Sequence, residues 1–209
     1  MIGQPVIART RAELNAMAFP VEAGQGEAVP WVLFDTQTYT SAVTTTLTFF
    51  GAAQADRTLS NLSIGGQLPE PQYFEIHNLG LDVIADGTAN VAVTELGIAD
   101  DIQKLMLVGR PIFNLEIANK NYGNFPLSFL HTSGGVWAAI AAGNTAATGN
   151  IQFANNSVPD GGWNWYGGVM IPPKQSFSVV VTFSAAQTLN GGNPPLRFWM
   201  SGTLHRVVR

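Results

Sequence analysis

Charged residues are scarce in this chain. Asp, Glu, Lys and Arg make up 11% of its 209 residues, less than half of the roughly 25% that is typical of globular domains. Mean hydropathy is positive. A monomer with so little surface charge is poorly protected against association. We therefore expect other chains to cover much of the surface, as in a component of an assembly rather than a free enzyme.

Cysteine is absent, which excludes disulfide bonds, thiolate metal ligands and a cysteine nucleophile together. The segment from Met1 to Thr10 contains no apolar stretch of the kind that a secretory signal requires. No apolar run approaches the length of about 18 residues that a membrane-spanning helix needs. The sequence therefore predicts no membrane insertion and synthesis in a cytoplasm.

The few charges are unevenly distributed. All 14 acidic residues lie at or before Asp160, and the chain after it carries four cations. These cations are Lys174, Arg197, Arg206 and Arg209. Arg9 and Arg11 likewise precede the first acid, Glu13. Mildly basic ends suit docking onto an acidic neighbouring subunit or light contact with nucleic acid. Neither end has the dense clusters of a nucleic-acid footprint, so nucleic-acid contact is the less favoured of the two.

The N-terminal residues 1–29 are expected to form an arm. Thr10 and Glu13 have the spacing of a capping box, which predicts a short helix over residues 10–18. A linker is then predicted from Gly24, Gly26 and Pro30. Such an arm either grips a neighbouring subunit or frays as a chain terminus.

Alternating apolar and polar residues, many of them β-branched, predict strands in most of the remaining chain. The predicted strands are 31–34, 43–50, 73–85, 112–118, 177–183 and 196–208. The apolar phase changes near Asn78–Gly80, which indicates a bulge or kink there. Residues 119–162 are rich in Asn, Gly, Ala and Ser and predict long surface loops with brief strands.

One helix is predicted between the strands. Its apolar face comprises Ile98, Ile102, Leu105 and Met106. Asp100 and Asp101 fall in the first turn, where the helix dipole favours anions. Gly109 is placed at the C′ position that ends the helix.

About eight strands, one inserted short helix and long asymmetric connections predict an all-β fold. We expect an antiparallel, jelly-roll-like sandwich of two sheets, formed as a single domain over residues 30–209. Long crossing loops favour a jelly roll over the immunoglobulin type, whose usual cysteine and tryptophan marks are missing.

The histidines offer little chemistry at the level of sequence. His77 lies beside Glu75, but adjacent strand residues point to opposite faces, so a surface or interface histidine is favoured. His131 and Ser133 lie among glycines without a nucleophile elbow, and His205 is interpreted as structural. Nucleotide-binding and metal-binding motifs are missing from the sequence. We therefore predict no catalytic residue, no cofactor, no metal and no enzymatic activity.

An aromatic cluster stands out at Trp163, Trp165 and Tyr166. On an extended segment the two tryptophans share a face and could stack on a sugar ring. Aromatic side chains also carry much of the binding energy at protein interfaces. Packing or subunit contact is favoured over glycan binding.

Several segments resemble shell proteins of icosahedral bacteriophages. Asn61–Pro69 followed by Phe74–Ile76 is similar to the turn that leads into a central jelly-roll strand of phage coat proteins. Ile171–Pro173, Phe177–Phe183 and Leu196–Arg206 resemble the closing strands of such proteins. The resemblance implies a non-enzymatic subunit with one jelly roll that packs as trimers or pentamers. Both a shell-forming capsid protein and a cement protein fit it.

These observations predict a virion structural protein that acts by self-assembly in the capsid, together with other capsid proteins. The residues expected at subunit contacts are Arg9, Arg11, Leu14, Trp163, Trp165, Tyr166, Arg206 and Arg209. A glycan- or receptor-binding module of a phage tail or fibre is the alternative. A β-sandwich hydrolase or lyase is a third hypothesis, and it requires a cleft where His77 or His131 meets a carboxylate.

Overall fold

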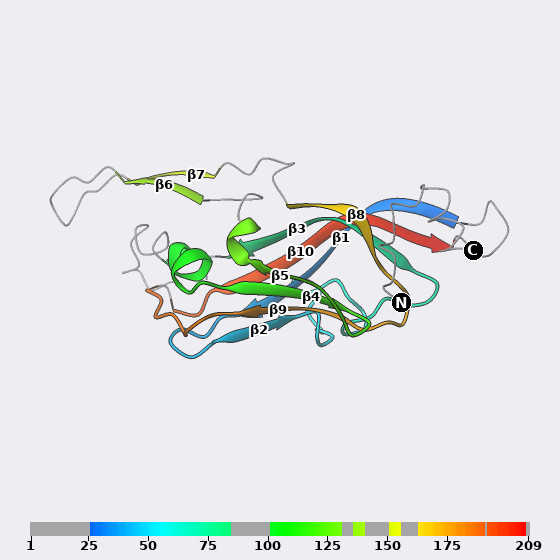
Figure 1. The fold of residues 1–209 in the computed structure, drawn as a ribbon, viewed down its shortest axis with the longest axis horizontal. Helices are drawn as coiled ribbons and strands as arrows, with labels where there is room; N and C mark the ends of the chain where they lie inside the picture. Colours follow the sequence, from blue (N-terminus) through cyan, green and yellow to red (C-terminus); the bar gives the residue numbers. More distant parts are fainter. Residues whose placement is uncertain are drawn as a thin grey trace, which may run out of the picture.

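The structure is a computed structural model that describes residues 26–84, 101–130, 136–140, 151–155, 163–190 and 192–207. Two four-stranded antiparallel sheets pack against each other, and a two-stranded hairpin accompanies them (Figure 1). Sheet A contains, in spatial order, β1 (Gly26–Thr38), β10 (Pro195–Val207), β3 (Tyr73–Val83) and β8 (Trp163–Ile171). Sheet B contains β2 (Thr46–Phe49), β9 (Phe177–Thr182), β4 (Ile112–Ile117) and β5 (Lys120–Pro126). The hairpin pairs β6 (Val136–Ile140) with β7 (Ile151–Asn155).

The order of the strands is that of a jelly roll. Counted along the chain without the hairpin, sheet A holds the first, eighth, third and sixth strands, and sheet B holds the second, seventh, fourth and fifth. Apart from the β4–β5 hairpin, every connection between these strands therefore passes from one sheet to the other. The predicted jelly-roll sandwich is confirmed. The β6–β7 hairpin lies between β5 and β8, within the region predicted as loops with brief strands.

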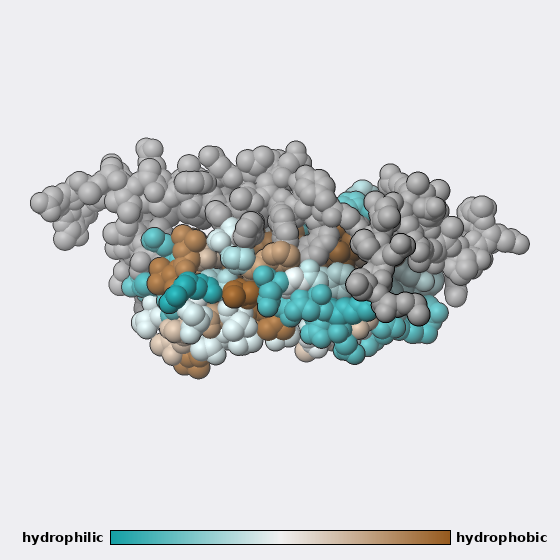
Figure 2. Space-filling view, in the orientation of Figure 1, coloured by the Kyte–Doolittle hydropathy of each residue, from teal (hydrophilic) through white to brown (hydrophobic). Residues whose placement is uncertain are grey.

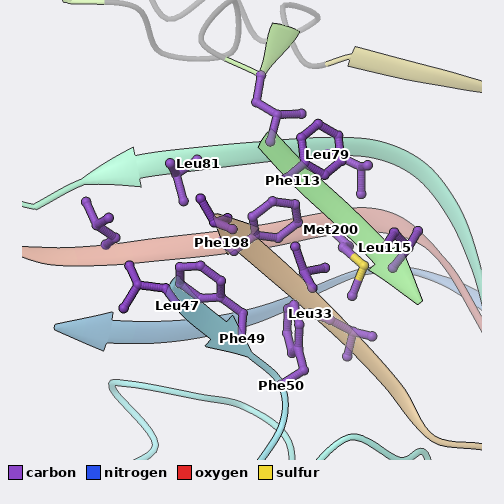
Figure 3. Packing of buried hydrophobic residues seen from close by; sticks show 14 of the residues in the cluster. Leu33, Leu47, Phe49, Phe50, Leu79, Leu81, Phe113, Leu115, Phe198 and Met200 are labelled. Carbon is purple, nitrogen blue, oxygen red and sulfur yellow. The ribbon is translucent and has the colours of Figure 1, made fainter. Parts of the chain in front are cut away.

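The core lies between the two sheets and consists of the alternating residues that the sequence pattern indicates. Phe113, Leu115 and Ile117 of β4 are buried, and every second residue of β9 is buried as well. Phe198 of β10 lies at the centre (Figure 3). Its ring lies 5.7 Å from that of Phe49 and 6.1 Å from that of Phe113, both on the opposite sheet. Burial of aromatic and aliphatic side chains therefore joins the sheets, each contributing about 1.5–3 kcal/mol.

The phase change predicted in β3 is confirmed as a bulge one residue before the predicted position. Pairing with β10 skips from Asn78 to Ile76, so that His77 is the extra residue. Phe74 and Ile76 are buried before the bulge, as are Leu79 and Leu81 after it. Gly202 of β10 faces the bulge, where a Cβ atom would overlap the backbone carbonyl of Glu75. The bulge therefore keeps both apolar runs of β3 on the core side.

The predicted helix is present, but its ending differs from expectation. Residues 101–103 form an α-helical turn that continues into the π-helical segment η1 (Lys104–Val108). Gly109 has a φ of −67°, and it is Arg110 that takes the left-handed conformation with a φ of 43°. Gly109 therefore does not provide a left-handed cap. Its missing side chain serves close packing instead, because a Cβ atom there would lie 3.2 Å from both Phe183 and the Lys104 carbonyl.

The linker predicted before the domain is wrong for Gly26 and Pro30. Both lie in β1, where they pair with Val207 and Thr203 of β10. β1 is the edge strand of sheet A, and Phe34 on the same strand directs its N–H outward to Asn61 Oδ1. Pro30 lies four residues before Phe34 and shares this outward backbone position. Its missing N–H therefore costs no bond to β10, which is why a proline is tolerated there. The predicted helix over residues 10–18 lies outside the described residues.

Candidate interaction surfaces

Of the five predicted contact residues near the two ends of the chain, the structure describes one, Arg206. Arg9, Arg11, Leu14 and Arg209 lie outside the described residues. Arg206 lies near the end of β10, where it is exposed and forms an ion pair with Glu27 of β1. Its charge is therefore already matched within the chain. The same holds for Lys174, which pairs with Glu70.

Arg197 is likewise used within the fold, on the outer face of sheet A. Its guanidinium lies 5.0 Å from the centre of the Phe34 ring, and its Nε donates a hydrogen bond of 3.1 Å to Thr36 Oγ1. Such a cation–π contact contributes about 0.5–1 kcal/mol at a partly exposed site. Beside it, Trp199 Nε1 donates to Asp82 Oδ1 at 3.4 Å. Burial raises the pKa of Asp82 above its ordinary value of 3.8. Each described cation of the C-terminal region, Lys174, Arg197 and Arg206, thus has a partner within the chain, which weakens the expectation that these cations dock onto an acidic neighbour.

The aromatic cluster lies on β8, the other edge strand of sheet A. The backbone of Trp163 pairs with Leu79 of β3, but the pairing then jumps, so that residues 165–168 stand opposite His77 alone. Trp165 and Tyr166 fall in this irregular segment; the side chains of residues 163–168 are outside what the structure describes. The regular extended segment on which the two tryptophans were expected to share a face is therefore interrupted between them.

Two histidines meet one carboxylate at the outer side of sheet A. His77 Nε2 lies 3.5 Å from Glu75 Oε1, and His205 Nε2 lies 3.6 Å from Glu75 Oε2. His205 is 1% exposed, whereas His77 is 48% exposed. The expectation that His77 and Glu75 face apart is wrong, because the two residues are separated by Ile76 and share one face of β3. His205 comes from the neighbouring strand β10, and no local sequence pattern indicates this contact.

In this cluster the Glu75 carboxylate lies beside the imidazole rings of His77 and His205. A carboxylate beside an imidazole can fix its orientation and accept its proton. No group of three or more ligands in the described part of the chain is arranged to hold a metal ion. His131, the other histidine considered for catalysis, lies outside the described residues. The hypothesis of a hydrolase or lyase requires that His77 or His131 meets a carboxylate in a cleft. The contact between His77 and Glu75 meets the first part of this requirement.

An open groove of about 540 Å³ runs beside the β1 edge, and we name it the β1 groove. Its lining residues are Pro30, Trp31, Val32, Asn61, His77, Ser201 and Gly202. Trp31 and Val32 are large exposed apolar residues. The Asn61 side chain lies along the open edge of β1. Its Nδ2 donates a hydrogen bond of 2.6 Å to the Val32 carbonyl, and its Oδ1 accepts one from the Phe34 N–H. Strand alternation places the Trp31 side chain on the same face of β1 as the buried Leu33, so the apolar side chain on the groove side is that of Val32. The groove therefore combines a small apolar surface with several polar groups.

Exposed apolar side chains also gather near the start of β4. Leu107 and Val108 of η1 and Ile112 of β4 are all exposed. Figures 1 and 2 look onto sheet B, whose four strands lie side by side in front of sheet A. Pale and brown atoms occupy much of this surface toward the η1 end, and teal atoms gather toward the opposite end (Figure 2). Sheet B thus presents a weakly polar outer face.

Among the described helices, none has the length and apolar character needed to cross a membrane. Comparison with protein-family models, with curated proteins and with solved structures found no match to this chain.

Proposed function

We propose that this protein is a structural subunit of an icosahedral bacteriophage virion, acting by self-assembly in the capsid and without catalytic activity. The observation that carries the proposal is the jelly-roll order of the eight sandwich strands. Jelly rolls are used in viral capsids, and also in lectins and cupins. Because a fold does not fix a function, the choice among these depends on the low charge, 11% of the residues, which suits a chain enclosed by others.

The physical basis of assembly is the burial of weakly polar surface between symmetric copies. Burial of apolar surface stabilises association by roughly 25 cal/mol per Å². Thr and Asn side chains at such contacts lose little solvation compared with ionised groups, which are depleted in the centre of interfaces. Trimers or pentamers of the subunit, in contact with other capsid proteins, are the expected units. Both a shell-forming subunit and a cement subunit act in this way.

Light scattering coupled to size-exclusion chromatography tests the proposal on the purified full chain. We expect discrete oligomers or particles at micromolar concentration, with electron microscopy of the same fractions revealing trimers, pentamers or shells. A stable monomer that does not associate up to about 100 μM would refute an assembly function. Crosslinking within purified particles then identifies the neighbours, and so distinguishes a shell-forming subunit from a cement subunit.

A glycan- or receptor-binding module of a phage tail or fibre is a second candidate, favoured by the β1 groove. The exposed Val32 lies there beside Asn61, Ser201 and His77. A concave site that combines apolar surface with a few amide, hydroxyl and imidazole groups is suited to holding a sugar ring and bonding its hydroxyls. On a glycan array, His77→Ala is expected to abolish binding while the oligomer remains intact. Absence of binding by the unmodified protein would exclude this function.

A further inference from the structure

The outer face of sheet B is almost free of charge, and it is built as three rows across the strands. Thr46, Thr182 and Ile112 form the first row, and Thr48, Val180 and Asn114 form the second. Ser178 and Glu116 form the third. The opposite side of the same strands supplies the core, so alternation directs these residues outward. We name these eight residues the sheet B face, of which Glu116 is the one charged member.

Two opposite charges flank this face along β4. Arg110 is exposed and lies just before the strand, and Glu116 lies near its other end. The extended chain from Ile112 to Glu116 spans roughly 13 Å, and Arg110 lies two residues before it. Among the described residues, neither side chain has an ion-pair partner, in contrast to Lys174 and Arg206, which are paired.

We propose that the sheet B face is a contact between two copies of this chain related by a two-fold axis. With the two β4 strands crossing antiparallel, Arg110 of one copy lies opposite Glu116 of the second, and the symmetry repeats the pair. The neutral rows between them bring β-branched residues together without burying a charge. This arrangement of charges is self-complementary, which favours a second copy over a partner of uniform charge.

The inference rests on the proposed assembly function and specifies one of its contacts. Eight side chains are fewer than the 20–30 residues per partner in a standard interface. The contact is therefore weak between isolated copies, and its repetition in a shell makes it effective. It links the trimers or pentamers across two-fold axes of the shell.

A charge-swap experiment on the full chain tests the contact. Sedimentation velocity over a concentration series measures the Kd for self-association of the unmodified protein, Glu116→Arg, Arg110→Glu and the double variant. Each single reversal replaces two ion pairs by two like-charge contacts, so we expect Kd to rise at least tenfold. The double variant restores both pairs with exchanged signs and is expected to return to within about threefold of the unmodified protein. Val180→Lys, in the middle row, is expected to abolish the contact.

Glu70→Arg is the matched control, because Glu70 is an exposed acid whose partner is Lys174. It is expected to leave Kd unchanged, since exposed ion pairs contribute little. Circular dichroism of every variant verifies folding. If the unmodified protein associates and the single reversals associate equally well, or the double variant stays as weak as the single ones, the contact lies elsewhere and only this inference is overturned. If the unmodified protein does not associate at all, the proposed function is overturned with it.

Discussion

Truncation of Phe198 at the centre of the sandwich is the most direct test of how the two sheets are held together. The side chain is fully buried on β10. The centre of its ring lies within 6.3 Å of the ring centres of Phe49, Phe50 and Phe113. Phe49 and Phe113 belong to sheet B, and Phe50 directly follows β2 of that sheet. Phe198→Ala removes these contacts and leaves a cavity between the sheets.

The expected loss follows from burial and from the cavity. Phe→Ala in a well-packed core costs about 3–5 kcal/mol. Three aromatic partners place Phe198 at the upper part of this range, because each favourable ring pair adds about 0.5–1.5 kcal/mol beyond burial. A domain of ordinary stability has about 5–15 kcal/mol in total. We therefore expect a loss of about 4–5 kcal/mol, with the fold retained but weakened.

Phe34→Ala is the matched control, since Phe34 pairs with Trp199 on the outer side of the same sheet and contacts Arg197. It removes a partly buried ring and one cation–π contact, and the expected cost is about 1–2 kcal/mol.

Urea unfolding of the dissociated chain measures the difference as a lower midpoint at unchanged m-value. If Phe198→Ala costs no more than Phe34→Ala, the aromatic cluster does not join the sheets as described.

Three further substitutions test particular contacts. Gly202→Ala is expected to cost about 3 kcal/mol in thermal unfolding, because its Cβ overlaps the Glu75 backbone; an unchanged Tm would contradict the tight β3–β10 approach. Asp35→Ala removes the acceptor of the buried Phe50 N–H, at 2.7 Å, and is expected to cost about 2 kcal/mol or more, with Asp35→Asn costing less. Because burial raises the pKa of Asp82 above 3.8, its contribution to stability is present below that pH and is lost as pH rises through the raised value. The stability of the unmodified protein relative to Asp82→Asn is therefore expected to fall as pH increases from about 3.8 in urea unfolding, and a constant difference would refute the shift.

Three strands of sheet B, β2, β4 and β9, could be predicted from sequence because their pattern is local. β5 lies in the region predicted as long loops with brief strands, and its burial does not alternate regularly. In β4 and β9, each apolar residue alternates with a polar one, and one buried face is enough to produce this period. The bulge at His77 was predictable for the same reason, since an extra residue shifts the phase of the apolar positions around it. β1 was predicted only over 31–34, because exposed residues and Pro30 hide the alternation of an edge strand.

The candidate surfaces were less predictable, because they depend on which strands become neighbours. Glu75 and His205 are 130 residues apart and meet because β3 pairs with β10. The sheet B face combines residues of β2, β4 and β9, and their register is invisible in any one segment. Arg9, Arg11 and Leu14 of the N-terminal arm lie outside the described residues, so their predicted contacts stay predictions, whereas residues 26–29 of the predicted arm belong to β1.

The amino-acid sequence by itself determined the all-β class, the inward side of most strands and the scarcity of charge, since each follows from composition or from a period of two. The tertiary structure alone decided that the first and last strands pair, that Arg206 is neutralised by Glu27, and that Arg110 rather than Gly109 turns left-handed. Backbone hydrogen bonds are the same for any two strands, so pairing is selected by the packing of side chains brought together from distant parts of the chain.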